Sequence, residues 1–290
     1  MRVHAAPPRS AGVSGGAIAT LVALAAGLGV ALVLAPSALA ASAPGGGYAN
    51  QGDLVAALRT AFVEYWHSGD RALTPGLAHV VDYWFRFHVV KGVIGALLLI
   101  VLAALGVRLW RAFVSAGGGV GSRTGSRVLL ASAGVLVGAS TLFSLAVVMA
   151  NIQGAVAPLS STLSMLPLGT PSGQLTGAVG QIRQHLSDYS GTTGHRLPAI
   201  DVMVNDFGRY HAVLVVIAAT VAIGFAGMSV ALWMRFRHTA AFDRHVRRAL
   251  AVLGVLTALL SVAVFVVTAA NISVATDPAP ALLAFFQGGW

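Results

Sequence analysis

The chain has 290 residues, of which 57% are hydrophobic and 9% are charged, whereas soluble domains carry roughly 25% charged residues. With a mean hydropathy of +0.81, a soluble fold could not bury its apolar surface, so the composition predicts an integral membrane protein. The absence of cysteine excludes disulfides, thiolate metal sites and a cysteine nucleophile.

The first 40 residues are typical of a secretion signal. Arg2 and Arg9 precede an apolar run, and Ala38 and Ala40 form an A-x-A cleavage motif. We therefore expect residues 1–40 to be a signal peptide cleaved after Ala40, or else an uncleaved first transmembrane helix, since the run is nearly long enough to span a bilayer. A twin-arginine signal needs adjacent arginines, which Arg2 and Arg9 are not.

Two polar helices are predicted outside the membrane. The first is capped by Asp53 and runs to about His67, and the second covers residues 175–189. Each places apolar residues on one face: Leu54, Leu58, Phe62 and Tyr65 in the first, and Leu175, Val179, Ile182 and Leu186 in the second. Residues 159–172 are rich in Pro, Ser and Thr and are predicted to be a linker loop.

Four apolar segments are predicted to span the membrane, at residues 87–110, 128–150, 211–234 and 249–270. A helix of about 24 residues is roughly 36 Å long, enough to cross a hydrocarbon core of about 30 Å with some tilt. We therefore expect a four-helix transmembrane bundle, in addition to the N-terminal signal or anchor helix.

The spans form a duplicated two-span unit. Arg86-Phe87-His88 opens the first span of one copy and Arg209-Tyr210-His211 that of the other, and Ala-Asn-Ile ends the second span of both copies at Asn151 and Asn271. The predicted organisation is residues 1–40 as signal or first helix, 41–158 as unit 1, 159–172 as linker and 173–290 as unit 2. The predicted fold class is an all-α membrane protein with small extracytoplasmic helical caps.

Charge predicts the orientation. The segments expected in the cytoplasm hold 11 of the 18 basic residues and one of the nine acids: Arg2, Arg9, Arg108, Arg111, Arg123, Arg127, Arg235, Arg237, Arg244, Arg247 and Arg248, with Asp243. This is the positive-inside pattern, and it explains the net charge of +9 without a nucleic-acid partner. We expect the N-terminus inside and the C-terminus outside.

Ionisable and polar residues near the outer ends of the spans are the site candidates, since such groups are costly in a membrane. They form a predicted polar layer at the outer rim: Arg86, His88, Lys91, Asn151, Arg209, His211 and Asn271. His88 and His211 occupy equivalent places, so they could ligate haem b or a divalent metal across the repeat axis. The alternative is that each histidine is a boundary residue, half in the headgroups and hydrogen-bonded to the neighbouring unit.

The other candidates also have two interpretations. Arg86 and Arg209 are expected to reach the outer headgroups or to pair with Asp82 and Asp206. Lys91 either extends its stem to the interface or faces the bundle interior as a functional group. The asparagines, Asn151 and Asn271, either end their helices or join the two histidines.

No catalytic constellation accompanies these residues. The nine acids lie outside the apolar segments, and there is no G-x-S-x-G, H-E-x-x-H or phosphate-loop motif. We therefore expect a non-enzymatic envelope protein whose caps bind a partner or lipid. The alternatives are a small transport or channel component, or a haem- or quinone-linked redox protein using His88 and His211.

Residues 83–92 (YWFRFHVVKG) and 149–158 (MANIQGAVAP) carry a family likeness. Over most of its length after the signal, the chain resembles a group of uncharacterised actinobacterial multi-pass membrane proteins, labelled only by a secretion signal that is sometimes described as twin-arginine. The resemblance implies a bacterial membrane location and no particular activity.

Overall fold

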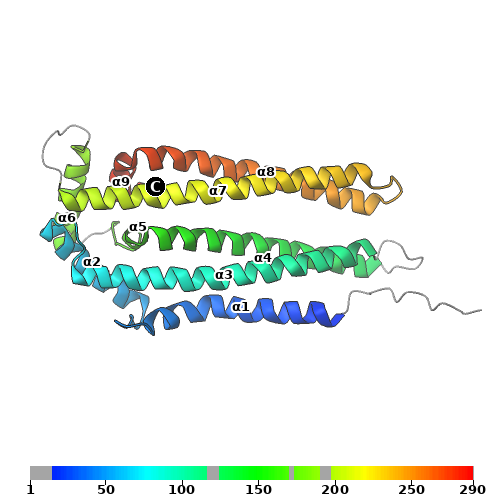
Figure 1. Cartoon of the computed structure of the whole chain (residues 1–290), viewed down its shortest axis with the longest axis horizontal. Helices are drawn as coiled ribbons and strands as arrows, with labels where there is room; N and C mark the ends of the chain where they lie inside the picture. The colour runs from blue at the N-terminus through cyan, green and yellow to red at the C-terminus, as the bar shows by residue number, and fades with distance from the viewer. Residues whose placement is uncertain (1–14, 116–123, 170–172, 190–196, 290) are drawn as a thin grey trace, which may run out of the picture. The chain divides into compact units, whose positions relative to one another are not determined.

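The computed structural model describes residues 15–115, 124–169, 173–189 and 197–289. In these ranges the regular elements are all helices, which confirms the predicted all-α class (Figure 1). They are α1 (Gly15–Ala41), α2 (Gln51–Ser68), α3 (Pro75–Ser115), α4 (Thr124–Val156), α5 (Pro158–Leu163), α6 (Gln174–Ser187), α7 (Pro198–His238), α8 (Arg244–Thr276) and α9 (Pro278–Phe286). Arg2, Arg9 and Arg123, which the charge count assigns to the cytoplasm, lie outside the described residues.

Five of the described helices are long and apolar enough to cross a membrane: Gly16–Ala41, Pro75–Ser115, Val128–Val156, Pro198–His238 and Arg244–Thr276. The multi-pass membrane class is therefore confirmed at this level, with α1 as the fifth candidate span. Helices α3 and α7 each have 41 residues, or about 61 Å at 1.5 Å per residue. Because a hydrocarbon core is only about 30 Å thick, both helices extend well beyond the bilayer.

The chain divides into two compact units that cut across α1, α3 and α4. One contains Met1–Leu32 and Ile94–Ala146, and the other contains Val33–Val93 and Val147–Trp290. In the first, the buried Ser144 hydroxyl of α4 donates to the Gly95 carbonyl of α3 at 2.9 Å. In the second, which holds all the candidate site residues, short helices pack around the first turns of α3 and α7.

We call these packed elements the cap: α2, α5, α6 and α9 with residues 75–84 of α3 and 198–207 of α7. Its core is apolar, and its largest fully buried side chains are Tyr65, Phe62, Phe286, Leu58, Leu77, Leu163, Leu175, Ile182, Ile200, Met203, Leu282 and Val80. The apolar faces predicted for the two polar helices are confirmed, because every one of those eight side chains is buried.

The two polar helices share one packed core with α9, a contact that the prediction of small helical caps did not include. The Trp66 indole of α2 donates to Gln181 Oε1 of α6 at 2.6 Å. Phe62 of α2 stacks on Phe286 of α9, with ring centroids 6.3 Å apart. Neither polar helix can bury its apolar face alone, and packing the two together with α9 removes both faces from water.

Two local predictions are also corrected. The predicted linker 159–172 contains the buried helix α5, which starts with Pro158 at a position where the missing N–H costs nothing. The N-cap of α2 is Asn50 instead of Asp53, because the Asn50 side chain accepts the Asp53 backbone N–H at 3.0 Å.

Helices α7 and α8 form an antiparallel hairpin joined by a short loop (Figure 1, yellow to orange). The buried Ser229 hydroxyl donates to the Gly254 carbonyl at 2.8 Å, and Ser261 donates to the Ala222 carbonyl at 2.8 Å. A β-carbon at Gly254 would lie 3.2 Å from Nε1 of Trp233. Small residues and interhelical hydroxyl bonds therefore hold this pair together, as is usual where both helices face lipid.

The buried hydroxyl of Tyr65 is expected to make the stability of the cap sensitive to alkaline pH. Its hydroxyl is buried without a hydrogen-bond partner among the described residues, and burial raises the pKa of Tyr65 from 10.0 to about 12. Because the pKa of Tyr65 is higher in the folded than in the unfolded protein, its protonated hydroxyl contributes to the free energy of unfolding. That contribution is complete below pH 10 and is lost as the pH rises to about 12. We expect Tyr65→Phe to be at least as stable as wild type at neutral pH and to lose less stability above pH 10. Thermal unfolding in detergent across this range tests it, and parallel pH profiles for the two proteins would contradict it.

Candidate functional site

The side chain of His88 in α3 is paired with Asn151 of α4. His88 Nδ1 lies 2.9 Å from Asn151 Oδ1. The Asn151 amide nitrogen donates to the Val147 carbonyl at 2.7 Å, which turns Oδ1 toward the imidazole. An amide oxygen only accepts, so Nδ1 of His88 carries a proton and donates.

The other nitrogen of His88 is paired with Ser161 of α5. His88 Nε2 lies 2.8 Å from Ser161 Oγ, and the Trp84 indole N–H donates to the same hydroxyl oxygen at 3.0 Å. Since the indole can only donate, the hydroxyl proton is available to Nε2 of a neutral histidine. We call Trp84, His88, Asn151 and Ser161 the His88 network; its donors and acceptors match throughout, and Asn151 and Ser161 are buried.

Backbone and aromatic packing hold the imidazole in place. A β-carbon at Gly154 would lie 2.5 Å from both Cε1 and Nε2 of His88, so only glycine admits the ring at this distance. On its other side the ring makes an edge contact with Trp84, at 4.9 Å between centroids and 76° between planes. Trp84 is itself stacked on Phe87 at 4.8 Å.

The end of α4 and the start of α5 also bond to α7. The buried Gln153 side chain donates to the Tyr210 carbonyl at 3.1 Å. Asp206 Oδ2 accepts both the backbone N–H and the hydroxyl of Ser160, at 2.7 and 2.8 Å. The residue preceding α5, Ala157, has no side chain that can cap it, so a carboxylate from α7 satisfies one of the free N–H groups at the start of α5, that of Ser160.

His211 and Asn271 form a second, more open pair. His211 Nδ1 lies 2.6 Å from Asn271 Oδ1, and the Asn271 amide nitrogen donates to the Val267 carbonyl at 2.8 Å. The second pair lacks the equivalents of Trp84 and Ser161. Phe207 stands four residues before His211, where Trp84 stands four residues before His88. Ala281 stands ten residues after Asn271, where Ser161 stands ten residues after Asn151. Among the described residues Nε2 of His211 therefore has no partner like Ser161.

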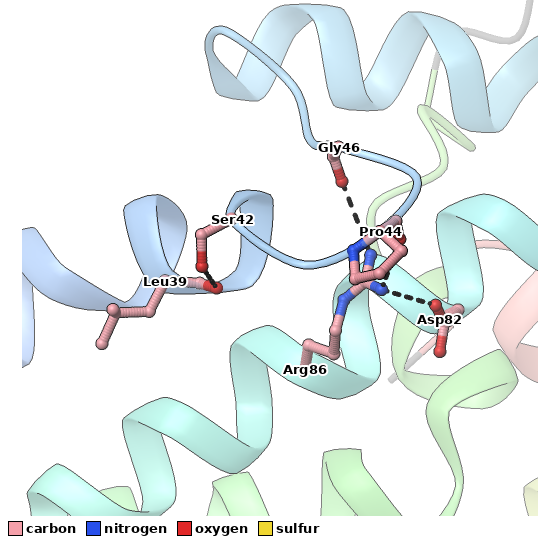
Figure 2. Close-up of polar contacts among 6 residues, drawn as sticks. All are labelled: Leu39, Ser42, Pro44, Gly46, Asp82 and Arg86. Carbon is pink, nitrogen blue, oxygen red and sulfur yellow. Dashed lines mark hydrogen bonds and ion pairs between the residues drawn. The ribbon is translucent and has the colours of Figure 1, made fainter.

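The arginine candidates behave differently from each other. Arg86 forms an ion pair with Asp82 at 2.8 Å and donates to the carbonyls of Pro44 and Gly46 at 3.2 and 3.5 Å. Figure 2 shows its guanidinium reaching the segment that follows α1, so Arg86 ties this segment to α3. The expected pairing with Asp82 is thus confirmed. Arg209 is exposed, and the Asp206 carboxylate is used by Ser160.

The interpretation of the asparagines as helix-terminal residues is wrong. Helices α4 and α8 continue to Val156 and Thr276, past Asn151 and Asn271, and both asparagines bond to histidines instead. Lys91 has its Nζ 5.3 Å from the centre of the Phe87 ring, one turn nearer the cap. This cation–π contact is what a lysine stem extended toward the interface gives.

The network fits a fixed structural joint better than a metal or haem ligand. An iron ligand needs a free imidazole lone pair, and both nitrogens of His88 already have protein partners. Within the described residues there is also no group of three or more His, Cys, Asp or Glu side chains that could hold a metal ion. Sequence reasoning missed Trp84, Gly154 and Ser161; the signal was the departure of residues 160–161 from their counterparts Pro280 and Ala281.

No protein-family model, curated protein or solved structure matches this chain.

Proposed function

We propose that this membrane protein is a non-enzymatic component of the cell envelope whose cap lies on the extracytoplasmic side and binds a partner there. The proposal goes with a duplicated two-span architecture and with the bacterial envelope location that the family resemblance implies.

The observation that carries the proposal is the change in side-chain distribution along the chain. In the cap the large apolar side chains are inside, with Leu58, Phe62 and Phe286 fully buried. In the spans they are outside, as for Val135 (73% exposed) and Ile223 (73% exposed). A domain with its apolar groups inside is suited to water, so the cap is built to project beyond the bilayer, where it can meet other molecules.

A closed polar network supports the non-enzymatic part. The side chains of the His88 network are hydrogen-bonded to one another, and Ser160 and Gln153 are hydrogen-bonded to α7. Catalysis needs a reactive group that can meet a substrate, whereas these groups are already paired. Their arrangement fits a joint that fixes the cap to the spans.

Matching elements support the duplication. Helices α3 and α7 have 41 residues each, α4 and α8 have 33 each, and each α3–α4 or α7–α8 pair contains one histidine–asparagine bond. A two-span unit repeated once keeps the same orientation in both copies. The caps of both copies would then lie on one side, as one shared core requires.

Single cysteines test orientation and binding together, because the chain has no native cysteine. We choose Thr176→Cys on the exposed face of α6 and Ala240→Cys in the α7–α8 loop. The positive-inside pattern places the loop in the cytoplasm, so a membrane-impermeant maleimide should label position 176 in intact cells and position 240 only after permeabilisation. Labelling with the opposite pattern would overturn the proposed orientation.

The Thr176→Cys variant also carries a thiol-linked photo-crosslinker for the binding part, with Leu136→Cys as its control. We expect one discrete adduct from position 176 in native membranes and none from Leu136→Cys, which is 68% exposed on a span and faces lipid. The adduct should recur when the identified partner carries the crosslinker in turn. Adducts of equal yield at positions 176 and 136, or no adduct at either position, contradict a binding cap.

The two alternatives receive less support. A redox role would need His88 to release Asn151 or Ser161 before it could bind haem. A transport role would place Lys91 beside the permeation path, whereas its ammonium lies over Phe87.

A further inference from the structure

We infer that the loop end of the α7–α8 hairpin binds the phosphate group of an anionic phospholipid. The site goes beyond the proposed function, because it lies at the opposite end of α7 from the residues that join the cap. It is a shallow cavity of about 240 Å³ lined by Phe236, Ala241, Arg244, Arg247, Arg248 and Ala251, which we call the arginine pocket.

The pocket exists because of helical spacing in α8. Residues 244, 247, 248 and 251 follow the i, i+3, i+4, i+7 pattern, so three arginines and one alanine share a face. Ala251 keeps that face shallow, and Phe236 from α7 supplies an apolar wall. Three positive charges therefore surround one hollow.

One arginine is held in position and two are available. Arg247 is half-buried, donates to the Thr239 carbonyl at 2.8 Å and lies over Phe236 at 4.3 Å from its ring centre. Arg244 and Arg248 are exposed. Within the part of the chain that the structure describes, none of these three arginines forms an ion pair with a carboxylate.

The nearest acid in the sequence, Asp243, supplies one negative charge beside three arginines and, among the described residues, forms no ion pair with them. Asp243 caps α8, and its Oδ1 accepts the Val246 backbone N–H at 3.4 Å. A cluster of arginines with an excess of positive charge is expected to recruit an anion, and the planar guanidinium matches the oxygens of a phosphate group.

Position relative to the bilayer selects a lipid phosphate over a free one. Arg248 is followed directly by the apolar span 249–270, so the pocket lies at headgroup depth. Phe242 in the loop beside it is 90% exposed. An aromatic ring so exposed is unfavourable in water but well placed at the boundary of headgroups and acyl chains, where it would hold the loop against the lipid.

The test measures lipid binding to the full chain in detergent by native mass spectrometry. The probes are phosphatidylglycerol, phosphatidylcholine with the same acyl chains, and inorganic phosphate. We expect the wild type to retain phosphatidylglycerol over phosphatidylcholine. The double variant Arg244→Gln/Arg248→Gln should lower the phosphatidylglycerol-bound to lipid-free ratio by about fivefold for each arginine removed.

A matched control separates the pocket from general charge. Arg235→Gln/Arg237→Gln removes two exposed arginines from the end of α7 that do not line the pocket, and it should leave the ratio within about twofold. An equal loss in both double variants, or equal retention of the two lipids, overturns the site. Displacement of phosphatidylglycerol by equimolar inorganic phosphate makes free phosphate the ligand and overturns the lipid assignment. Because Arg244 and Arg248 are exposed, the variant should fold, and an unchanged gel-filtration profile checks that it does.

Discussion

Gly154→Ala is expected to lower the free energy of unfolding by about 2–4 kcal/mol. The new methyl carbon would lie 2.5 Å from Cε1 and Nε2 of His88 and 2.7 Å from Cδ2. The imidazole would have to move, and the bonds to Asn151 and Ser161 fix it from both sides. Overpacking and the loss of at least one buried hydrogen bond therefore act together. Thermal or denaturant unfolding in detergent, followed by tryptophan fluorescence, measures the loss.

Two glycines of the same helix are the matched controls. A β-carbon at Gly134 or Gly138 would meet nothing within 4 Å, so alanine there should be neutral or stabilising by up to about 1 kcal/mol. The clash also has a specific partner, since removing the ring in His88→Ala should remove most of the further cost of Gly154→Ala. Additive effects of Gly154→Ala and His88→Ala would show that the cost of the alanine does not come from its contact with His88.

Leu58→Ala in α2 is expected to cost about 2–5 kcal/mol, because Leu58 is 0% exposed in the cap core and its removal leaves a cavity. The same substitution at Leu136, which is 68% exposed on α4, should cost under about 0.5 kcal/mol. Lipid solvates a leucine or an alanine there about equally, so little packing is lost. Denaturant unfolding of both variants in the same detergent tests the pair.

The comparison between the two leucines separates two sources of stability. If the cap is the cooperative core, Leu58→Ala should also make α2 and α6 susceptible to protease while the spans stay inserted. A larger loss for Leu136→Ala than for Leu58→Ala would mean that span packing dominates the unfolding transition and that the cap contributes little.

What the sequence determined by itself is local. A low content of charged residues and long apolar runs predict a membrane protein. Each span forms its backbone hydrogen bonds within its own helix, whatever its neighbours are, so this prediction needs no tertiary structure. Periodicity within α2 and α6 predicted which side chains face a core, since Leu58 and Ile182 need only helical geometry to share a face with their apolar neighbours. His88, His211, Asn151 and Asn271 were candidates because their setting recurs along the chain.

Only the tertiary structure decided which of these residues meet. His88 reaches Asn151 and Ser161 across 63 and 73 residues of chain, and Trp66 reaches Gln181 across 115. Such contacts depend on how helices pack, and the periodicity of a single helix carries no information about its partner. That packing brings α2 and α6 together in one cap and places α5 beside α3. It also gives both ring nitrogens of His88 a hydrogen-bond partner. The physical reason is that the hydrophobic effect is non-directional, so an apolar helix face can pack against any complementary apolar surface. Hydrogen bonds depend on distance and angle, so they discriminate between such surfaces only once the helices are in contact.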